Sequence, residues 1–278
     1  METKKVWFVT GASKGLGLTL VKALLADGYC VAATSRTQQG LLDAIGKHSN
    51  FLPVEMDITD NEDVAKAVQI ACERFGKIDV IVNNAGYSQI GTLEELTDHE
   101  ARRNFDVNVF GSINVIRNTT PLLRRQKSGH IFNIASVGGL VGSFPAFGIY
   151  CSTKFAVAGF TEALAVEMKP FGVHTTLVYP GYFRTDFLAK GSVQTPENPI
   201  QEYVAAREME AAHLNQINGN QPNDPQKAAA LFIEISKLEN PPTHLLMGED
   251  AYDMLQNKIK ILTEESEKWK DYTLSTGY

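Results

Sequence analysis

The stretch VWFVTGASKGLG, residues 6 to 17, decides the fold of this chain. Its first part, Val6 to Val9, is apolar and predicts a buried strand. A helix is predicted next, because apolar side chains then recur at helical spacing: Leu16, Leu20, Val21, Leu24 and Leu25. The glycines therefore lie where a strand turns into a helix. Glycine lets the backbone turn tightly and approach a ligand, and the free N–H groups of a helix N-terminus suit a phosphate.

This loop alone is compatible with two functions. Its spacing, G-x-x-x-G-x-G, suits a nucleotide but is a weak signal. The same residues contain Gly11-x-Ser13-x-Gly15, which matches the strand-turn-helix elbow that carries the nucleophile of serine hydrolases. A nucleotide loop and a catalytic Ser13 both remain open at this point.

Composition bounds the class of protein. The chain has 278 residues, 44% hydrophobic and 21% charged, which predicts one globular domain over residues 1–278. A net charge of −6 argues against a nucleic-acid partner. The three scattered cysteines (Cys30, Cys72 and Cys151) indicate reduced thiols and a cytoplasmic location. We expect no signal peptide, because a strand pattern begins almost at Met1, and no membrane span, because no apolar run approaches roughly 20 residues.

Strands and helices alternate along the chain. Apolar runs predict strands at residues 6–9, 29–34, 51–56, 78–82, 130–135, 173–179 and 244–247. Helix starts are indicated by capping-box patterns at Thr59-x-x-Glu62 and Thr97-x-x-Glu100, and by Asp224-Pro225. One long helix is expected through Asn108 to about Arg125, and an amphipathic one over 251–262. The pattern predicts a single-domain, doubly wound α/β fold with a parallel sheet of about seven strands and helices on both faces.

Distinctive residues cluster at one edge of this predicted sheet. Ligands bind beyond the C-terminal ends of parallel strands. The special residues all follow strands there: Gly11 to Gly17, Arg36, Asp57, Asn83 to Gly86, Ser136 and Pro180-Gly181. Their convergence at one edge of the sheet is stronger evidence for a ligand-binding site than any single motif.

Tyr150 and Lys154 form the second key pattern. Four residues apart on a helix, they lie one turn from each other. A nearby ammonium favours the phenolate, so we expect the pKa of Tyr150 to lie below its ordinary value, which suits proton exchange with a substrate oxygen. Ser136, at the end of the neighbouring strand, is placed to hydrogen-bond the same oxygen. Taken alone, a Tyr-x-x-x-Lys pair is most often an ordinary surface pair.

With these motifs in order, the sequence resembles the short-chain dehydrogenase/reductase family and its Rossmann fold. The motifs are TGASKGLG, NNAG, VNVFG, IAS, YCSTK and PGYFRT, and they span Thr10 to Thr185. The resemblance implies that Tyr150 exchanges the proton, that Lys154 binds the nicotinamide ribose and tunes Tyr150, and that Ser136 orients the substrate carbonyl. Asn108 would support a water-mediated proton path to Lys154. The residues implied to contact the cofactor are Gly11, Ser13, Lys14, Gly15, Leu16, Gly17, Ser35, Arg36, Asp57, Ile58, Asn83, Ala85, Gly86, Tyr150, Lys154, Pro180, Gly181, Phe183 and Thr185.

The residues after the second predicted strand indicate which nicotinamide cofactor the protein binds, NAD or NADP(H). An acidic residue there would bond the ribose hydroxyls of NAD, but this chain has Ser35-Arg36. A guanidinium and a hydroxyl suit a 2′-phosphate, and Lys14 adds a second cation in the glycine loop. We therefore expect NADP(H). The alternative is that both cations are simply solvated.

The substrate pocket is expected to be apolar. Its candidate residues are Ser136, Phe144, Phe147, Tyr150, Tyr182 and Phe187. Residues 182–222 are expected to form a substrate-binding loop or helical insertion. The chain after Asp224 resembles the branch that contains 17β-hydroxysteroid and retinol dehydrogenase-like enzymes, which often take bulky apolar substrates. The six histidines lack metal-ligand spacing, so we interpret them as structural or surface residues and expect no metal.

These observations predict an NADPH-dependent oxidoreductase that reduces a ketone or aldehyde to an alcohol, reversibly. A homodimer or homotetramer is expected. A non-catalytic NADP(H)-sensing regulator on the same fold is the first alternative. A serine hydrolase using Ser13 is the second, but Ser13 follows the first strand, whereas the hydrolase elbow needs earlier strands before it.

Overall fold

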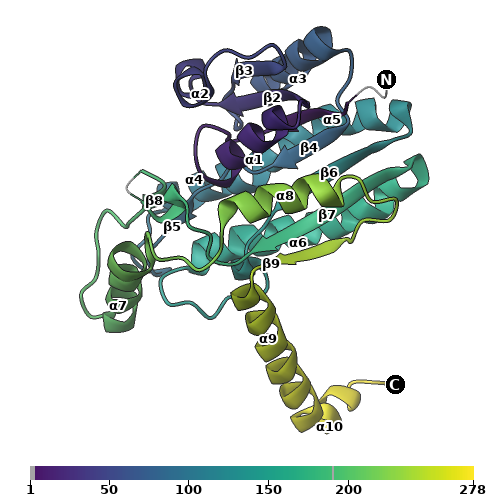
Figure 1. The fold of residues 1–278 in the computed structure, drawn as a ribbon. Coiled ribbons are helices and arrows are strands. Elements are labelled where there is room, and N and C mark those ends of the chain that lie inside the picture. Colours follow the sequence, from purple (N-terminus) through teal and green to yellow (C-terminus); the bar gives the residue numbers. More distant parts are fainter. Residues whose placement is uncertain (1–3, 190) are drawn as a thin grey trace.

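A seven-stranded parallel sheet forms the centre of the molecule (Figure 1). The computed structural model describes residues 4–189 and 191–278. The strand order is β3-β2-β1-β4-β6-β7-β9. The strands are β1 (Val6–Val9), β2 (Cys30–Ser35), β3 (Phe51–Glu55), β4 (Val80–Asn83), β6 (Gly129–Ile134), β7 (Val173–Pro180) and β9 (His244–Met247). The predicted doubly wound fold is confirmed.

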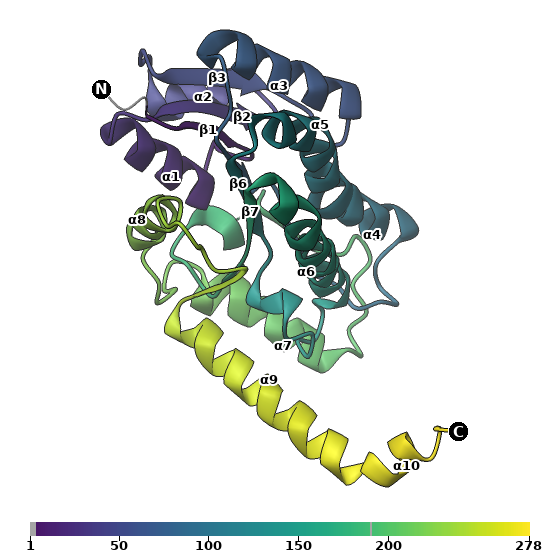
Figure 2. The same cartoon turned by 90° about the vertical axis from the view of Figure 1, so that its right-hand side faces the viewer.

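Helices cover both faces of the sheet because successive strand residues point to opposite sides (Figure 2). Trp7 and Val9 pack with α1 (Gly15–Ala26), α2 (Gln38–Ile45) and α8 (Pro225–Ile235). Phe8, between them in the chain, points to the other face and packs with α3 (Asn61–Phe75), α5 (Gly111–Gln126) and α6 (Gly148–Met168). Two apolar cores, one on each face of the sheet, therefore pack the sheet against its helices.

Two of the three predicted helix starts are confirmed. Thr97 and Glu100 form a capping box at the start of α4 (Asp98–Phe105), and the Asp224 side chain accepts a hydrogen bond from the Gln226 amide ahead of α8. The predicted box at Thr59 and Glu62 is wrong. Asp60 caps α3 instead, because its carboxylate accepts hydrogen bonds from the amides of Glu62 and Asp63.

The long helix predicted through Asn108 has an unpredicted irregularity. Between α4 and α5 lies a π-helical turn, η1 (Asp106–Phe110), and the Gly111 amide donates to the Asp106 carbonyl five residues earlier. The turn adds one residue to the local helical repeat and places Asn108 inside the fold, 1% exposed. The remaining short turns are the 3₁₀ segments η2 (Val137–Gly139), η3 (Lys169–Phe171) and η4 (Asp186–Leu188).

Residues 182–222, expected to form a loop or helical insertion, also contain a short strand that the sequence did not predict. Strand β8 (Val193–Gln194) pairs in parallel with β5 (Ser88–Gln89) and forms a separate two-stranded sheet. Helix α7 (Val204–Ala212) and a π-helical turn, η5 (His213–Ile217), follow. Figure 1 shows β5, β8 and α7 gathered beside the C-terminal ends of the main strands.

The C-terminal helix is longer than predicted. Helix α9 (Glu249–Lys268) and the short α10 (Lys270–Leu274) extend away from the body of the molecule in both views (Figures 1 and 2). Among the described residues, no helix combines the length and apolarity that a membrane crossing requires.

Candidate active site

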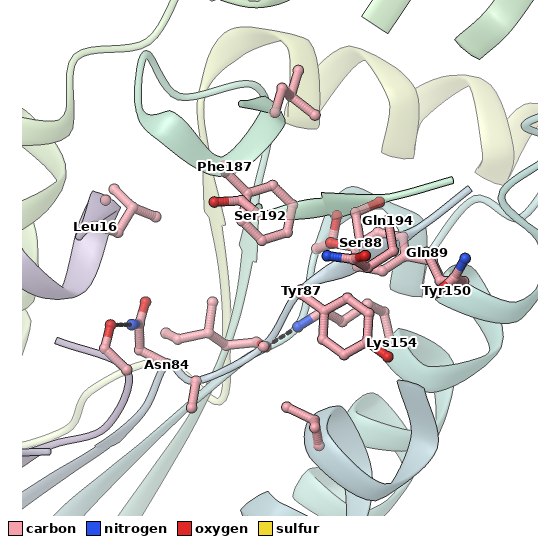
Figure 3. Close-up of a pocket in the computed structure, with 18 of the residues that line it drawn as sticks. Leu16, Asn84, Tyr87, Ser88, Gln89, Tyr150, Lys154, Phe187, Ser192 and Gln194 are labelled. Atoms are coloured by element: carbon pink, nitrogen blue, oxygen red, sulfur yellow. Dashed lines mark hydrogen bonds between the residues drawn. The ribbon is translucent and has the colours of Figure 1, made fainter. Parts of the chain in front are cut away.

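A cavity of about 570 Å³ opens at the C-terminal ends of the sheet strands. Figure 3 shows Leu16 of the glycine loop on one side of it, and Tyr87, Tyr150 and Lys154 on the other. The sequence-predicted residues that line it are Gly11, Ser13, Lys14, Gly15, Leu16, Ser35, Arg36, Asp57, Ile58, Ala85, Gly86, Ser136, Phe144, Phe147, Tyr150, Lys154, Pro180, Gly181, Tyr182, Phe183, Thr185 and Phe187. The structure therefore brings together groups from almost the whole chain.

The glycine loop needs glycine at two positions. Gly11 has φ +64°, and a Cβ there would lie 2.7 Å from the Cα of Ala85. Gly15 has φ +59° and faces Thr185 across the cavity, 3.8 Å from where its Cβ would be. Both positions disfavour any other residue. At the N-terminus of α1, none of the described side chains caps the backbone amides, which leaves them available to an anion.

Two predicted cofactor residues lie outside the cavity lining. A Cβ at Gly17 would lie 2.5 Å from Nδ2 of Asn84, so this glycine allows α1 to pack against the loop after β4. The Asn83 amide donates to Oδ1 of Asn133 at 2.7 Å, inside the sheet. Asn84, next to it, lines the cavity instead and donates to the Thr10 carbonyl at 2.9 Å. Gly17 and Asn83 therefore support the elements that carry the cavity lining, and do not line the cavity themselves.

Helix α6 carries Tyr150 and Lys154 into the cavity. Lys154 Nζ donates to the Ile134 carbonyl at 2.9 Å and lies 5.8 Å from the centre of the Tyr150 ring. Burial lowers the pKa of Lys154 to about 8. Burial also raises the pKa of Tyr150 above its ordinary value, and a hydrogen bond with Ser136 only partly offsets this. The expected lowering of the Tyr150 pKa is thus wrong in this structure, because desolvation of the buried phenolate is the largest influence on that pKa.

Ser136 reaches the same point from the end of β6. Its hydroxyl accepts a hydrogen bond from the Gly138 amide at 3.1 Å, and a Cβ at Gly138 would lie 3.5 Å from both Ser136 Oγ and the Tyr150 ring. The tight neighbour of such a Cβ is Cys151 Sγ at 3.2 Å, so a side chain at position 138 would press on Cys151, next to Tyr150 in the chain. An uncharged phenol next to a fixed hydroxyl can donate a proton to an oxygen held between them.

Asn108 lies behind the cavity and does not line it. Its amide nitrogen donates to the Tyr87 carbonyl and to Thr153 Oγ1, both at 3.0 Å, and its oxygen accepts from the Tyr87 amide at 3.0 Å. It therefore joins the loop after β4 to α6. A Cβ at Gly86 would lie 3.0 Å from Asn108 Oδ1 and 3.7 Å from Lys154 Nζ, so the three residues are neighbours.

Two cations face the far end of the cavity. The pKa of Lys14 is lowered by burial and then by the guanidinium of Arg36, which shows that the two positive charges are close. Lys14 Nζ donates to the Gly191 carbonyl at 3.3 Å. The Ser35 hydroxyl donates to the Thr37 carbonyl at 2.6 Å, so its proton is engaged in the start of α2. The carboxylate of Asp57 accepts from the backbone and hydroxyl of Thr59.

Part of the insertion predicted at residues 182–222 lines the cavity, through residues that the sequence did not single out. We call Gly191 to Tyr203 the lid, because it pairs with β5 and lines the cavity through Ser192, Gln194, Thr195 and Glu197. Its far end is held by two buried carboxylates. Glu100 accepts from the Glu197 amide at 3.1 Å, and Glu95 accepts from the Ile200 amide at 2.7 Å.

Glu95 also pairs with Arg207 of α7 at 2.8 Å. Burial by itself raises the pKa of Glu95, but hydrogen bonds from Thr92 and Ile200 and the charge of Arg207 outweigh it, and the net pKa is lowered. The ionised Glu95 therefore ties the lid to α7.

His213 was interpreted as a structural or surface residue, but it lines the cavity. Its Nδ1 bonds the Met209 carbonyl at 2.9 Å, and its Nε2 lies 3.0 Å from the Tyr182 hydroxyl. Burial lowers the pKa of His213, which keeps the ring neutral. Behind Tyr182, the Asp250 carboxylate at the start of α9 accepts from the Tyr182 amide at 2.7 Å and from the Asn223 side chain at 2.8 Å. Nothing in the local sequence pattern indicates either contact.

No group of three or more histidine, cysteine, aspartate or glutamate side chains that could hold a metal ion occurs in the described part of the chain. A glycine-rich loop between strand and helix and a buried tyrosine-lysine pair line one cavity on a doubly wound sheet, an arrangement typical of dinucleotide-dependent oxidoreductases. The short chain dehydrogenase family model matches residues 5–195, and the protein belongs to the short-chain dehydrogenase/reductase family. This assignment leaves no place for the serine hydrolase alternative.

Similar proteins cover nearly the whole chain. "Oxidoreductase BOA17" of Botryotinia fuckeliana is 37% identical over 277 residues, 98% of this chain and 99% of that protein. Human 17-beta-hydroxysteroid dehydrogenase type 1 is 31% identical over 269 residues, 92% of this chain and 81% of that protein. These relatives support the predicted resemblance.

Solved structures agree with these relatives. A short-chain dehydrogenase from Streptomyces avermitilis superposes with a TM-score of 0.89 at 35% identity, covering 98% of this chain and 100% of that one. A short chain dehydrogenase from Burkholderia cenocepacia in complex with NADP has a TM-score of 0.73 at 27% identity, covering 96% of this chain and 98% of that one.

Proposed function

We propose that this oxidoreductase uses NADPH to reduce an apolar or bulky ketone or aldehyde to the alcohol, and that the reaction is reversible. The observation that carries the proposal is the meeting of Ser136, Tyr150 and Lys154 in the cavity that the glycine loop also lines. The residues present fit a dinucleotide: two glycines with positive φ leave room for a backbone-bound phosphate, and the cavity continues from there to Arg36. When bound, the nicotinamide supplies or accepts the hydride.

The protein's own groups manage the proton. The phenol of Tyr150 stays protonated at neutral pH, because burial raises its pKa, so it is ready to donate to a carbonyl oxygen during reduction. The Ser136 hydroxyl holds that oxygen in place. The ammonium of Lys154, held at Ile134, stabilises the phenolate that forms and is positioned to bind ribose hydroxyls. In this proposal Asn108 acts by holding Tyr87 and Thr153, which position Lys154.

The cavity walls support an apolar substrate. Around the tyrosine lie Phe147, Leu188 and Cys151, which are buried in one apolar cluster with Tyr150. Phe187 approaches the Tyr150 ring to 6.3 Å between ring centres. Aromatic walls of this kind favour large, weakly polar carbonyl compounds over small charged acids. We therefore propose that the lid and α7 form the substrate-binding segment. The proposed cellular location is the cytoplasm, which the free thiols fit.

The proposal is tested by the Tyr150→Phe variant in an NADPH-oxidation assay over aliphatic, aromatic and polycyclic ketones. We expect turnover to fall by roughly 100-fold or more, because general acid catalysis contributes about that much. NADPH affinity should not change. The control is Tyr29→Phe, a tyrosine that packs on Trp7 away from the cavity, and it should keep wild-type turnover. If Tyr150→Phe turned over near the wild-type rate with NADPH bound, the proposed role of Tyr150 would be wrong. If the wild type reduced no ketone in the panel, the regulator alternative would be favoured.

A further inference from the structure

We propose that α9 is a dimerisation element that pairs in antiparallel fashion with α9 of a second copy of this chain. The helix is anchored to the body along its first two turns, where Ala251 is buried and Met254, Leu255 and Lys258 are half-buried. From Ile259 onward every residue is exposed, including Leu262 at 51% and Trp269 at 51%. Large apolar side chains on a projecting helix indicate a face that is covered by another surface.

The apolar side chains form one seam. Tyr252, Leu255, Ile259, Leu262, Ser266 and Trp269 follow one another at alternating steps of three and four residues. This is the heptad spacing of the a and d positions in a coiled coil. Tyr252 and Ile259 occupy a positions, and Leu255, Leu262 and Trp269 occupy d positions. On this seam Tyr252, Ile259, Leu262 and Trp269 are exposed, by 48% to 55%, and Leu255 is half-buried. Figure 2 shows the outer half of α9 projecting from the body.

An antiparallel pair brings a positions against d positions. One register then places Ile259 against Leu262 of the second copy, Leu255 against its Ser266, and Tyr252 against its Trp269. Each contact occurs twice because of the two-fold symmetry. The two bodies then lie at opposite ends of the helix pair.

The charges beside the seam fit the same register. Lys258 and Glu265 both occupy g positions, and g positions face each other in an antiparallel pair. The register that pairs Ile259 with Leu262 sets Lys258 of each copy next to Glu265 of the other. A parallel pair would instead set Lys258 near Thr263 and bring both bodies to one end. The surface is therefore complementary to itself in the antiparallel orientation.

A membrane surface fits this helix less well. Between Glu249 and Leu274 there are seven acidic and four basic side chains. The acidic excess repels the anionic lipids that attract amphipathic helices to membranes. A second copy of the chain is therefore the partner that the seam and its flanking charges select.

The first test compares two neighbouring residues by measuring mass in solution with sedimentation equilibrium. Leu262 and Ile261 are 51% and 50% exposed, but only Leu262 lies on the seam. We expect Leu262→Asp to halve the mass of the assembly and Ile261→Asp to leave it unchanged. Circular dichroism and NADPH affinity should stay at wild-type values in both, because neither side chain packs against the body. A monomeric wild type, or an unchanged mass for Leu262→Asp, would overturn the proposal; wild-type monomers that float with anionic vesicles would point to a membrane instead.

The second test exchanges the charges. Lys258→Glu and Glu265→Lys should each raise the dissociation constant of the dimer by about tenfold, because each sets like charges against each other twice. The double variant restores two opposite-charge pairs and should return the dissociation constant close to the wild-type value. Failure of the double variant to recover would contradict the antiparallel register.

Discussion

Removing the two cations at the far end of the cavity tests the proposed preference for NADPH over NADH. Arg36 is exposed at the end of β2, and its charge lowers the pKa of Lys14, which places the two groups at one site. A hydrogen bond between ionised groups contributes about 1.5–3 kcal/mol. Because Arg36 is exposed to solvent, we take the lower end, about 1.5 kcal/mol, which corresponds to roughly tenfold in affinity.

The assay is a fluorescence titration of each cofactor into the apo protein. Arg36→Ala should weaken NADPH binding about tenfold and leave NADH binding unchanged, because only NADPH carries the 2′-phosphate. Lys14→Ala should act in the same direction, and the double variant should fall short of the product of the two effects, since both cations serve one phosphate. Lys22→Ala, an exposed cation on the outer face of α1, is the control. If the double variant kept the wild-type ratio of NADPH to NADH affinity, the reasoning would be refuted.

Two further changes probe the buried charges of the site. Lys154→Met should abolish turnover and yet stabilise the fold by about 1–3 kcal/mol at pH 7, because burial lowers the pKa of Lys154 to about 8 from 10.5 and a buried ammonium is therefore costly. Between pH 8 and pH 10.5 the unfolded chain binds more protons than the folded one, so the stability of the wild type rises with pH in this range. The extra stability of Lys154→Met over the wild type should therefore shrink as the pH rises. Thermal melts of both proteins across pH 7 to 10 would measure this. Glu95→Gln should speed NADPH release about tenfold in stopped-flow fluorescence, because it removes one of the two carboxylates that pair with Arg207, leaving only Glu210, and weakens the hydrogen bond that holds Ile200 of the lid. Glu167→Gln, an exposed carboxylate on α6, is its control, and equal release rates in the two variants would contradict the role of the lid.

Local pattern was sufficient to predict the sheet, the glycine loop and the tyrosine-lysine pair. Continuous apolar runs mark parallel strands, and turns between strand and helix carry their own signature at Gly11 and Gly15. The capping box at Thr97 was predictable for the same reason, because its partners lie within one turn. At Thr59 the identical pattern failed because Asp60, one residue later, is the stronger cap.

The remaining features depend on contacts between distant segments. The pairing of β5 with β8 joins residues about a hundred positions apart, and neither strand is long enough to show alternation. The π-helical turn at Asn108 leaves no mark in a pattern with a period of 3.6 residues. The direction of the Tyr150 pKa was predicted wrongly because the sequence displays the charge of Lys154 but not the depth of burial. His213 was missed because its role depends on Tyr182, far along the chain.

Asp250 divides the C-terminal segment into two parts that can be separated. Its carboxylate holds the Tyr182 backbone and the Asn223 side chain, so the first turn of α9 belongs structurally to the wall of the cavity. The outer turns beyond Ile259 are exposed. A chain shortened within those outer turns should therefore keep a complete cavity, whereas one shortened before Asp250 would lose the backing of Tyr182. The boundary between the part of α9 that supports the cavity wall and the part that projects from the body thus falls inside a single continuous helix.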